Sequence, residues 1–171
     1  HPDIELMLCA SGGGRVDPAA LSHFHEVWPS DNTDPVFRVR MQWAMSTFFP
    51  ALVVGAHVTR WGNRPVAFGC AVAMSARFGF DIDPAGLTEP ERTVCARACR
   101  AYKEIAHIVQ HGDLFRLVSP KTGDNAALMY SLDENEAVVF AYQLGDRPRS
   151  STLLIDSLRP EQMYNITAID L

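Results

Sequence analysis

The first sixty residues alternate short apolar runs with helical segments that begin at proline, and this alternation constrains the fold more than any other feature. The runs at 4–10, 27–28 and 51–58 predict buried strands. Asp17-Pro18 and Asp34-Pro35 each place a capping side chain before a proline of the first helical turn, which predicts a helix after each pair. Strands that alternate with helices favour a parallel sheet in an α/β fold.

Each predicted strand ends close to a side chain that can take part in chemistry. Cys9, Asp31 and His57 lie at or just after the ends of the three strands in turn and are separated by 22 and 26 residues. A TIM (β/α)8 barrel uses about 30 residues for each of its units and carries its catalytic groups at the carboxyl ends of the strands. The spacing therefore fits the last three units of such a barrel.

The sequence pattern changes after a long predicted helix. An Ala-rich stretch at 65–78 is expected to be helical, and a capping box at 88–91 opens a helix that should run to about His111. Short apolar runs divided by Gly, Pro, Asn and Asp then predict antiparallel strands at 114–118, 127–132, 137–144, 152–156 and 164–169. We expect an α/β chain with the C-terminal part of a TIM (β/α)8 barrel and its closing helices over 1–113, followed by a small antiparallel β domain over 114–171.

Charge and composition exclude several classes of protein. The chain has 20 acidic and 15 basic side chains, a formal net charge of -5, and its basic residues are scattered, so we expect no nucleic-acid partner. No apolar run reaches the roughly 18 residues of a transmembrane helix, so we expect no membrane partner. The four cysteines lack the density and spacing of a disulfide framework, which predicts a reducing compartment and a cytoplasmic location.

Two residue pairs on the long predicted helix superficially resemble metal ligands. Cys95 with Cys99, and His107 with His111, lie four residues apart, so each pair shares a helix face. Neither pair has the second pair that a closed zinc site needs, and a His in the last helical turn already complements the helix dipole. We therefore expect no metal site and no cofactor.

The candidate site residues each have a simpler alternative. The glycine run that starts at Gly12 would let backbone amides approach a phosphate or a sugar hydroxyl, although such a run is more often a tight turn. Asp34 precedes a first-turn proline and is predicted to cap the next helix. Asp31 then remains as a candidate general acid at the mouth of its strand, or as a turn residue. His57 could bind a substrate hydroxyl or a neighbouring loop.

Several longer motifs occur in a recognisable order. They are Cys-Ala-Ser-Gly-Gly-Gly-Arg at 9–15, Trp-Pro-Ser-Asp-Asn-Thr-Asp-Pro at 28–35, Phe-Phe-Pro at 48–50, Gly-Ala-His-Val at 55–58, Arg-Phe-Gly at 77–79 and His-Gly-Asp-Leu-Phe-Arg-Leu at 111–117. Together they resemble the retaining α-galactosidases of glycoside hydrolase family 36 over essentially the whole chain. In this resemblance the last two motifs mark the helical exit from the barrel and the start of the C-terminal β domain.

The resemblance implies a function and residue roles. Asp31 matches the general acid/base of the family, and Cys9 and Gly12 match residues that contact the galactose ring. The implied substrate is a galactose-containing oligosaccharide of the raffinose or melibiose type, from which terminal α-linked galactose is released by double displacement. The implied intact enzyme is a homo-oligomer.

The same resemblance places the nucleophile elsewhere. The family carries its nucleophilic aspartate in a Lys-Trp-Asp motif, whereas Trp28, Trp43 and Trp61 precede Pro, Ala and Gly here. We therefore expect the nucleophile to lie outside this chain and the chain alone to be inactive. Two other hypotheses remain: a noncatalytic sugar-binding or scaffold module, and a structural fragment without a ligand. Replacing Asp31 by Asn separates enzyme from binding module, because only the enzyme would lose turnover.

Overall fold

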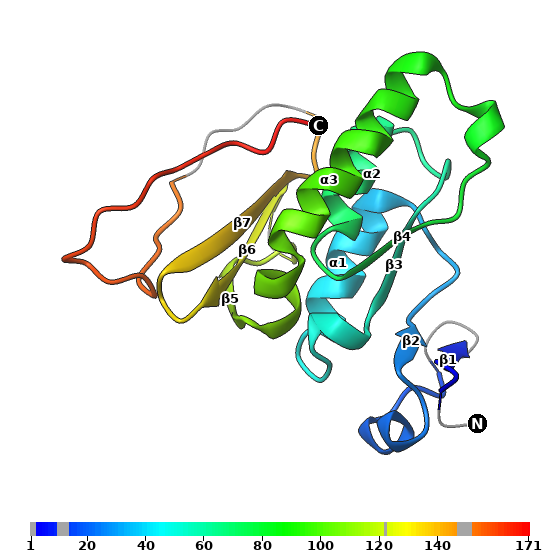
Figure 1. The fold of residues 1–171 in the computed structure, drawn as a ribbon, viewed down its shortest axis with the longest axis horizontal. Coiled ribbons are helices and arrows are strands. Elements are labelled where there is room, and N and C mark those ends of the chain that lie inside the picture. The colour runs from blue at the N-terminus through cyan, green and yellow to red at the C-terminus, as the bar shows by residue number, and fades with distance from the viewer. Residues whose placement is uncertain (1–2, 10–13, 122, 147–151) are drawn as a thin grey trace.

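Four short parallel strands follow one another in sequence order in the computed structural model, which describes residues 3–9, 14–121, 123–146 and 152–171 (Figure 1). Strand β1 (Met7–Cys9) pairs with β2 (Glu26–Trp28), and β3 (Gly55–Val58) pairs with β4 (Arg77–Phe80). A parallel bridge between Val27 and Val54 links the two pairs. The four carboxyl ends therefore lie at one edge, as in other parallel α/β arrangements.

The helices between these strands begin where the Asp-Pro pairs predict. Asp17 accepts a hydrogen bond from the backbone of Ala20 at the start of the 3-10 helix η1 (Pro18–Ser22). Asp34 accepts one from the backbone N–H of Phe37 at 2.9 Å and opens α1 (Pro35–Met45). The predicted capping role of Asp34 is confirmed, and this carboxylate is committed to the helix.

Three predicted boundaries in this part are wrong. The strand expected from residue 4 begins only at Met7. The run at 51–58 begins with a 3-10 turn, η2 (Ala51–Val53), so that only β3 is a strand. The helix expected over 65–78 is the shorter α2 (Val66–Ala73), and the residues that the resemblance placed in a helical exit form β4. Backbone pairing with β3 over four residues determines this strand, and a run so short carries no periodicity from which to predict it.

A long helix then crosses the middle of the molecule (Figure 1). After the 3-10 turn η3 (Pro84–Gly86), helix α3 (Glu89–His111) starts at the predicted capping box, in which Thr88 and Glu91 bond each other's backbone N–H groups. Its buried residues are Ala98, Ile105, Ile108 and Val109. Among the residues that the structure describes, no helix is long and apolar enough to cross a membrane.

A three-stranded antiparallel sheet packs against α3. Its order is β5 (Asp113–Val118), β6 (Asn125–Leu132) and β7 (Glu136–Gln143), which confirms three of the predicted strands. The described residues of 152–156 and 164–169 form no strand, so those two predictions are wrong. Leu154 and Ile166 are largely exposed there, and an apolar run becomes a strand only where a neighbouring strand takes up its backbone hydrogen bonds.

Three tyrosines attach this sheet and α3 to α2 and to the residues that follow it. Each tyrosine hydroxyl donates a hydrogen bond to a backbone carbonyl: Tyr130 to that of Ser75, Tyr142 to that of Ala71 and Tyr102 to that of Ala76. Burial raises the pKa of Tyr130 and of Tyr142, so both hydroxyls stay protonated donors. One continuous hydrophobic core joins the parallel and antiparallel parts.

The capping box gives a stability prediction with a control on the same helix. Replacing Thr88 by Ala is expected to lower the free energy of unfolding by about 1 kcal/mol, because the N–H of Glu91 loses its acceptor. The same replacement at Thr93, an exposed residue inside α3, should raise it by up to about 0.5 kcal/mol through helix propensity. Urea unfolding measures both, and equal effects of the two replacements would contradict a capping role for Thr88.

Candidate functional site

A groove of about 600 Å³ lies across the carboxyl ends of the four parallel strands. Its lining residues come from all four strand ends: Met7, Cys9, Trp28, Asp31, Thr33, His57, Thr59, Trp61, Phe80 and Asp81. The structure thus brings the predicted site residues Cys9 and Asp31 into one groove, whereas Gly12 lies outside the described residues. The roles of all three remain predictions.

Trp28 holds the carboxylate of Asp31 in place. The side chain of Trp28, 8% exposed, forms part of the groove floor at the end of β2. Its indole N–H donates a hydrogen bond to Oδ1 of Asp31 at 3.0 Å. The carboxylate is therefore oriented by a nearly buried ring while it stays exposed to the groove.

The buried guanidinium of Arg38 packs against the ring of Trp28. The guanidinium carbon of Arg38, on α1, lies 4.9 Å from the centre of the Trp28 ring, a cation–π distance. Arg38 also donates hydrogen bonds to the carbonyl oxygens of Ser30, at 3.2 Å, and of Gly55. Burial lowers the pKa of Arg38 to about 10, so the group is still charged at neutral pH. Arg38 thereby joins α1, the loop before Asp31 and the start of β3.

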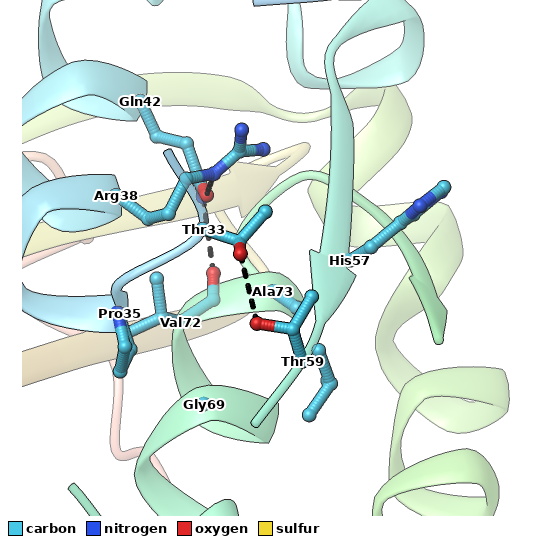
Figure 2. Close-up of a pocket in the computed structure, with 10 residues that line it drawn as sticks. Thr33, Pro35, Arg38, Gln42, His57, Thr59, Gly69, Val72 and Ala73 are labelled. Carbon is cyan, nitrogen blue, oxygen red and sulfur yellow. Dashed lines mark hydrogen bonds between the residues drawn. The ribbon is translucent and has the colours of Figure 1, made fainter. Parts of the chain in front are cut away.

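Polar side chains complete this support beneath the groove (Figure 2). Gln42 accepts a hydrogen bond from Nε of Arg38 at 3.4 Å and donates to the carbonyl of Val72 and to Oγ of Ser75, each at 3.0 Å. The hydroxyl of Thr59 donates a hydrogen bond to that of Thr33 at 2.8 Å, drawn as the dashed line between these two residues in Figure 2. The loops after β2 and β3 are therefore tied to each other and to α2.

The imidazole of His57 contacts the same indole in a tilted arrangement. The centres of the His57 and Trp28 rings are 4.7 Å apart, with the planes inclined by 42°. A side chain on Gly79 would place its Cβ 2.7 Å from Cδ2 of His57, so the glycine leaves the imidazole its space. Partial burial lowers the pKa of His57, and the charge of Arg38 adds to that effect, while Glu26 and Asp81 oppose it. The ring is therefore mainly neutral at pH 7 and can donate or accept a hydrogen bond.

Several groove and support residues were not identified from the sequence. Phe80 ends β4 and Asp81 follows it, in a segment whose start was expected to be helix, and a short apolar run closed by an acidic residue was the available signal. Arg38 and Gln42 are buried polar residues four positions apart, so both lie on one face of α1. Polar residues among the apolar positions of a short helix could have indicated a buried network.

The two residue pairs that resembled metal ligands have other surroundings. Nε2 of His107 lies 3.0 Å from a carboxylate oxygen of Glu136. Cys95 contacts Cys70, whose pKa is raised to about 12 mainly by burial. Within the described ranges, no cluster of three or more His, Cys, Asp and Glu side chains is placed to hold a metal ion.

Comparison with known proteins gives one consistent family. The Melibiase family model matches residues 1–112. Alpha-galactosidase AgaA of Geobacillus stearothermophilus is 35% identical over 177 aligned residues, which cover 98% of this chain and 24% of that protein. The bifunctional alpha-galactosidase/sucrose kinase AgaSK of Mediterraneibacter gnavus is 32% identical over 96% of this chain and 18% of its own length.

Solved structures agree with these sequence matches. The glycoside hydrolase family 36 alpha-galactosidase AgaB of Geobacillus stearothermophilus has a TM-score of 0.88 at 35% identity, over 94% of this chain and 24% of its own. The alpha-galactosidase of Lactobacillus brevis also has a TM-score of 0.88, at 27% identity, over 95% of this chain and 23% of its own. The chain spans about a quarter of the length of AgaA and AgaB.

The lowered pKa of His57 predicts a pH dependence of stability. The unfolded chain binds a proton at this histidine near its ordinary pKa of about 6.5, above the pKa in the folded protein. The free energy of unfolding should therefore decrease as the pH falls below about 6.5 and level off below the folded pKa. Urea unfolding of the wild type and of a His57→Gln variant at a series of pH values measures this difference. Parallel profiles for the two proteins would contradict it.

Proposed function

Because the chain belongs to the Melibiase family and, within it, to the α-galactosidases of glycoside hydrolase family 36, we propose that it forms the acid/base side of a retaining α-galactosidase active site. The observation that carries this proposal is the single groove that joins Cys9, Asp31 and His57 at the carboxyl ends of four parallel strands. The term "intact enzyme" here means this chain together with the residues that supply the nucleophile.

The proposed architecture is the C-terminal part of a (β/α)8 barrel over 1–113, followed by an antiparallel β domain over 114–171. The sequential parallel order of β1 to β4, with a groove at their carboxyl ends, supports a barrel. Around β1, the apolar side chains of Ile4, Leu6 and Met7 are each about half exposed, at 50%, 48% and 48%. Packing of a further barrel strand against this edge would cover them.

In the proposed mechanism, Asp31 first acts as an acid. The indole N–H of Trp28 bonds Oδ1, so Oδ2 is the oxygen that carries the proton to the departing glycosidic oxygen. At the same time a second carboxylate, about 5–5.5 Å away, attacks the anomeric carbon and forms a glycosyl-enzyme. Asp31 then takes a proton from the water that releases galactose. We place the second carboxylate outside this chain, since none of the three tryptophans here belongs to a Lys-Trp-Asp motif.

The proposed substrate is an oligosaccharide with terminal α-linked galactose. Variants of AgaA have been solved in complex with raffinose and with stachyose, and this chain is 34% and 35% identical to them. We assign the thiol of Cys9 and the backbone at Gly12 to the galactose ring, and the neutral imidazole of His57 to a substrate hydroxyl. Two carboxylates and water suffice for this reaction, so it requires no metal or cofactor.

Two further properties belong to the proposal. The cysteine composition supports a cytoplasmic location. We also propose that the intact enzyme is a homo-oligomer and that it requires neither a nucleic-acid nor a membrane partner.

Replacing Asp31 by Asn in the intact enzyme tests the acid/base role. We expect kcat/KM for raffinose to fall by about 10²–10⁴-fold, because the amide cannot transfer a proton. The loss should be smaller for an aryl α-galactoside, whose phenolate departs without protonation. Asp34→Asn is the matched control: Asn also caps helices, so activity should stay within about twofold of the wild type.

Two results would overturn this assignment. Wild-type turnover of raffinose by the Asp31→Asn variant would exclude Asp31 as the acid/base. An intact protein that binds galactosides but hydrolyses none, with affinity unchanged by Asp31→Asn, would establish a sugar-binding module instead.

The 171-residue chain alone provides a second test. We expect it to leave an aryl α-galactoside unhydrolysed under conditions in which the intact enzyme is active, because one of the two carboxylates is missing. Release of the phenol chromophore measures the reaction. Turnover by the chain alone would show that it carries its own nucleophile.

A further inference from the structure

Trp61, which lines the groove, is far more exposed than the other two tryptophans of the chain. Trp61 is 58% exposed, whereas Trp28 and Trp43 are 8% and 9% exposed. It lies on the loop after β3 and lines the groove together with Asp31 and Asp81. A large exposed aromatic side chain at a groove is unusual enough to indicate a binding role.

The loop that carries Trp61 is fixed in place on its N-terminal side. The hydroxyl of Thr59 accepts a hydrogen bond from the backbone N–H of Trp61 at 3.1 Å and donates one to Thr33. The guanidinium of Arg60 donates to the carbonyl of Gly86 at 2.7 Å and to the carboxylate of Glu91 at 3.0 Å.

The C-terminal side of Trp61 is equally constrained. Gly62 has a φ of +87°, a conformation that favours glycine. A Cβ at this position would lie 2.3 Å from Oδ2 of Asp34, the residue that caps α1. The backbone therefore packs closely against the start of α1, and the indole of Trp61 projects from a fixed loop.

The strand order indicates which part of a substrate reaches this indole. Cys9 ends β1, and Asp31 and Trp61 follow β2 and β3, so Asp31 lies between the other two along the groove. With galactose against Cys9, the group that leaves with the oxygen protonated by Asp31 extends toward Trp61. An indole face stacks well on the apolar face of a pyranose ring, and the carboxylate of Asp81 can accept a hydrogen bond from a sugar hydroxyl.

We infer that Trp61 is the platform for the leaving sugar and sets the preference of the enzyme for oligosaccharides over galactosides with small leaving groups. This inference rests on the proposed α-galactosidase function. Because Trp61 lies on the leaving-group side of Asp31 in this arrangement, its replacement should slow the reaction of a substrate with a sugar leaving group more than that of a substrate with a small one.

The test compares two substrates of the intact enzyme. The measured quantity is kcat/KM for raffinose divided by kcat/KM for methyl α-galactoside, whose leaving group has no ring to stack. We expect Trp61→Ala to lower this ratio by about three- to tenfold, the usual contribution of one aromatic stacking contact. Trp61→Tyr, which keeps an aromatic face, should restore most of the ratio.

The control is Phe48→Ala. Phe48 is an aromatic residue of similar accessibility, 74% exposed, on the connection between α1 and β3, away from the groove lining. This variant should keep the wild-type ratio. A ratio unchanged by Trp61→Ala, or lowered equally by Phe48→Ala, would overturn the inference while the hydrolysis of both substrates still supported the proposed function. Failure of the wild-type intact enzyme to hydrolyse either substrate would overturn both.

Discussion

The groove depends on the interactions of the buried Arg38 guanidinium with the groups that surround it. A guanidinium out of water is tolerated only where hydrogen bonds and polarisable groups surround it. Here carbonyl oxygens of the loop after β2 and of β3, the amide of Gln42 and the face of Trp28 provide that environment. None of these partners is a carboxylate, so the positive charge also acts on the groove, where it contributes to the lowered pKa of His57.

Two glycines allow large side chains to cross between neighbouring strands. A Cβ at Gly55 would lie 2.6 Å from Oε1 of Glu26, and this open space lets the carboxylate of Glu26 extend past β3 to Arg77, 3.1 Å away on β4. At Gly79 the lack of a side chain likewise leaves room for the imidazole of His57. Thus β2 and β4 are joined by an ion pair across β3. The arrangement of the groove therefore depends on these two glycines, which have no side chain, as well as on the residues that line it.

The parts of the fold that were predicted correctly are those that local interactions determine. The caps at Asp34 and Thr88 depend on groups within three residues, so the sequence pattern is sufficient. Strand β4 depends on pairing with β3, about twenty residues earlier, and its four residues continue an Ala-rich segment that favours helix. Asp81 was consequently not placed in the groove that holds Asp31. The shared groove of Cys9 and Asp31 was expected from the strand spacing, whereas the supporting position of Arg38 requires a tertiary structure.

A path of hydrogen bonds and ring contacts connects the antiparallel sheet to Asp31. Tyr130 on β6 donates to the carbonyl of Ser75, whose hydroxyl accepts from Gln42. Gln42 in turn accepts from Arg38, which supports the ring of Trp28, and that ring donates to the carboxylate. Each contact fixes the next, because every buried polar group here must keep its partner. The sheet thus fixes the end of α2, and the position of the groove carboxylate depends on residues more than forty positions beyond the last strand of the parallel part.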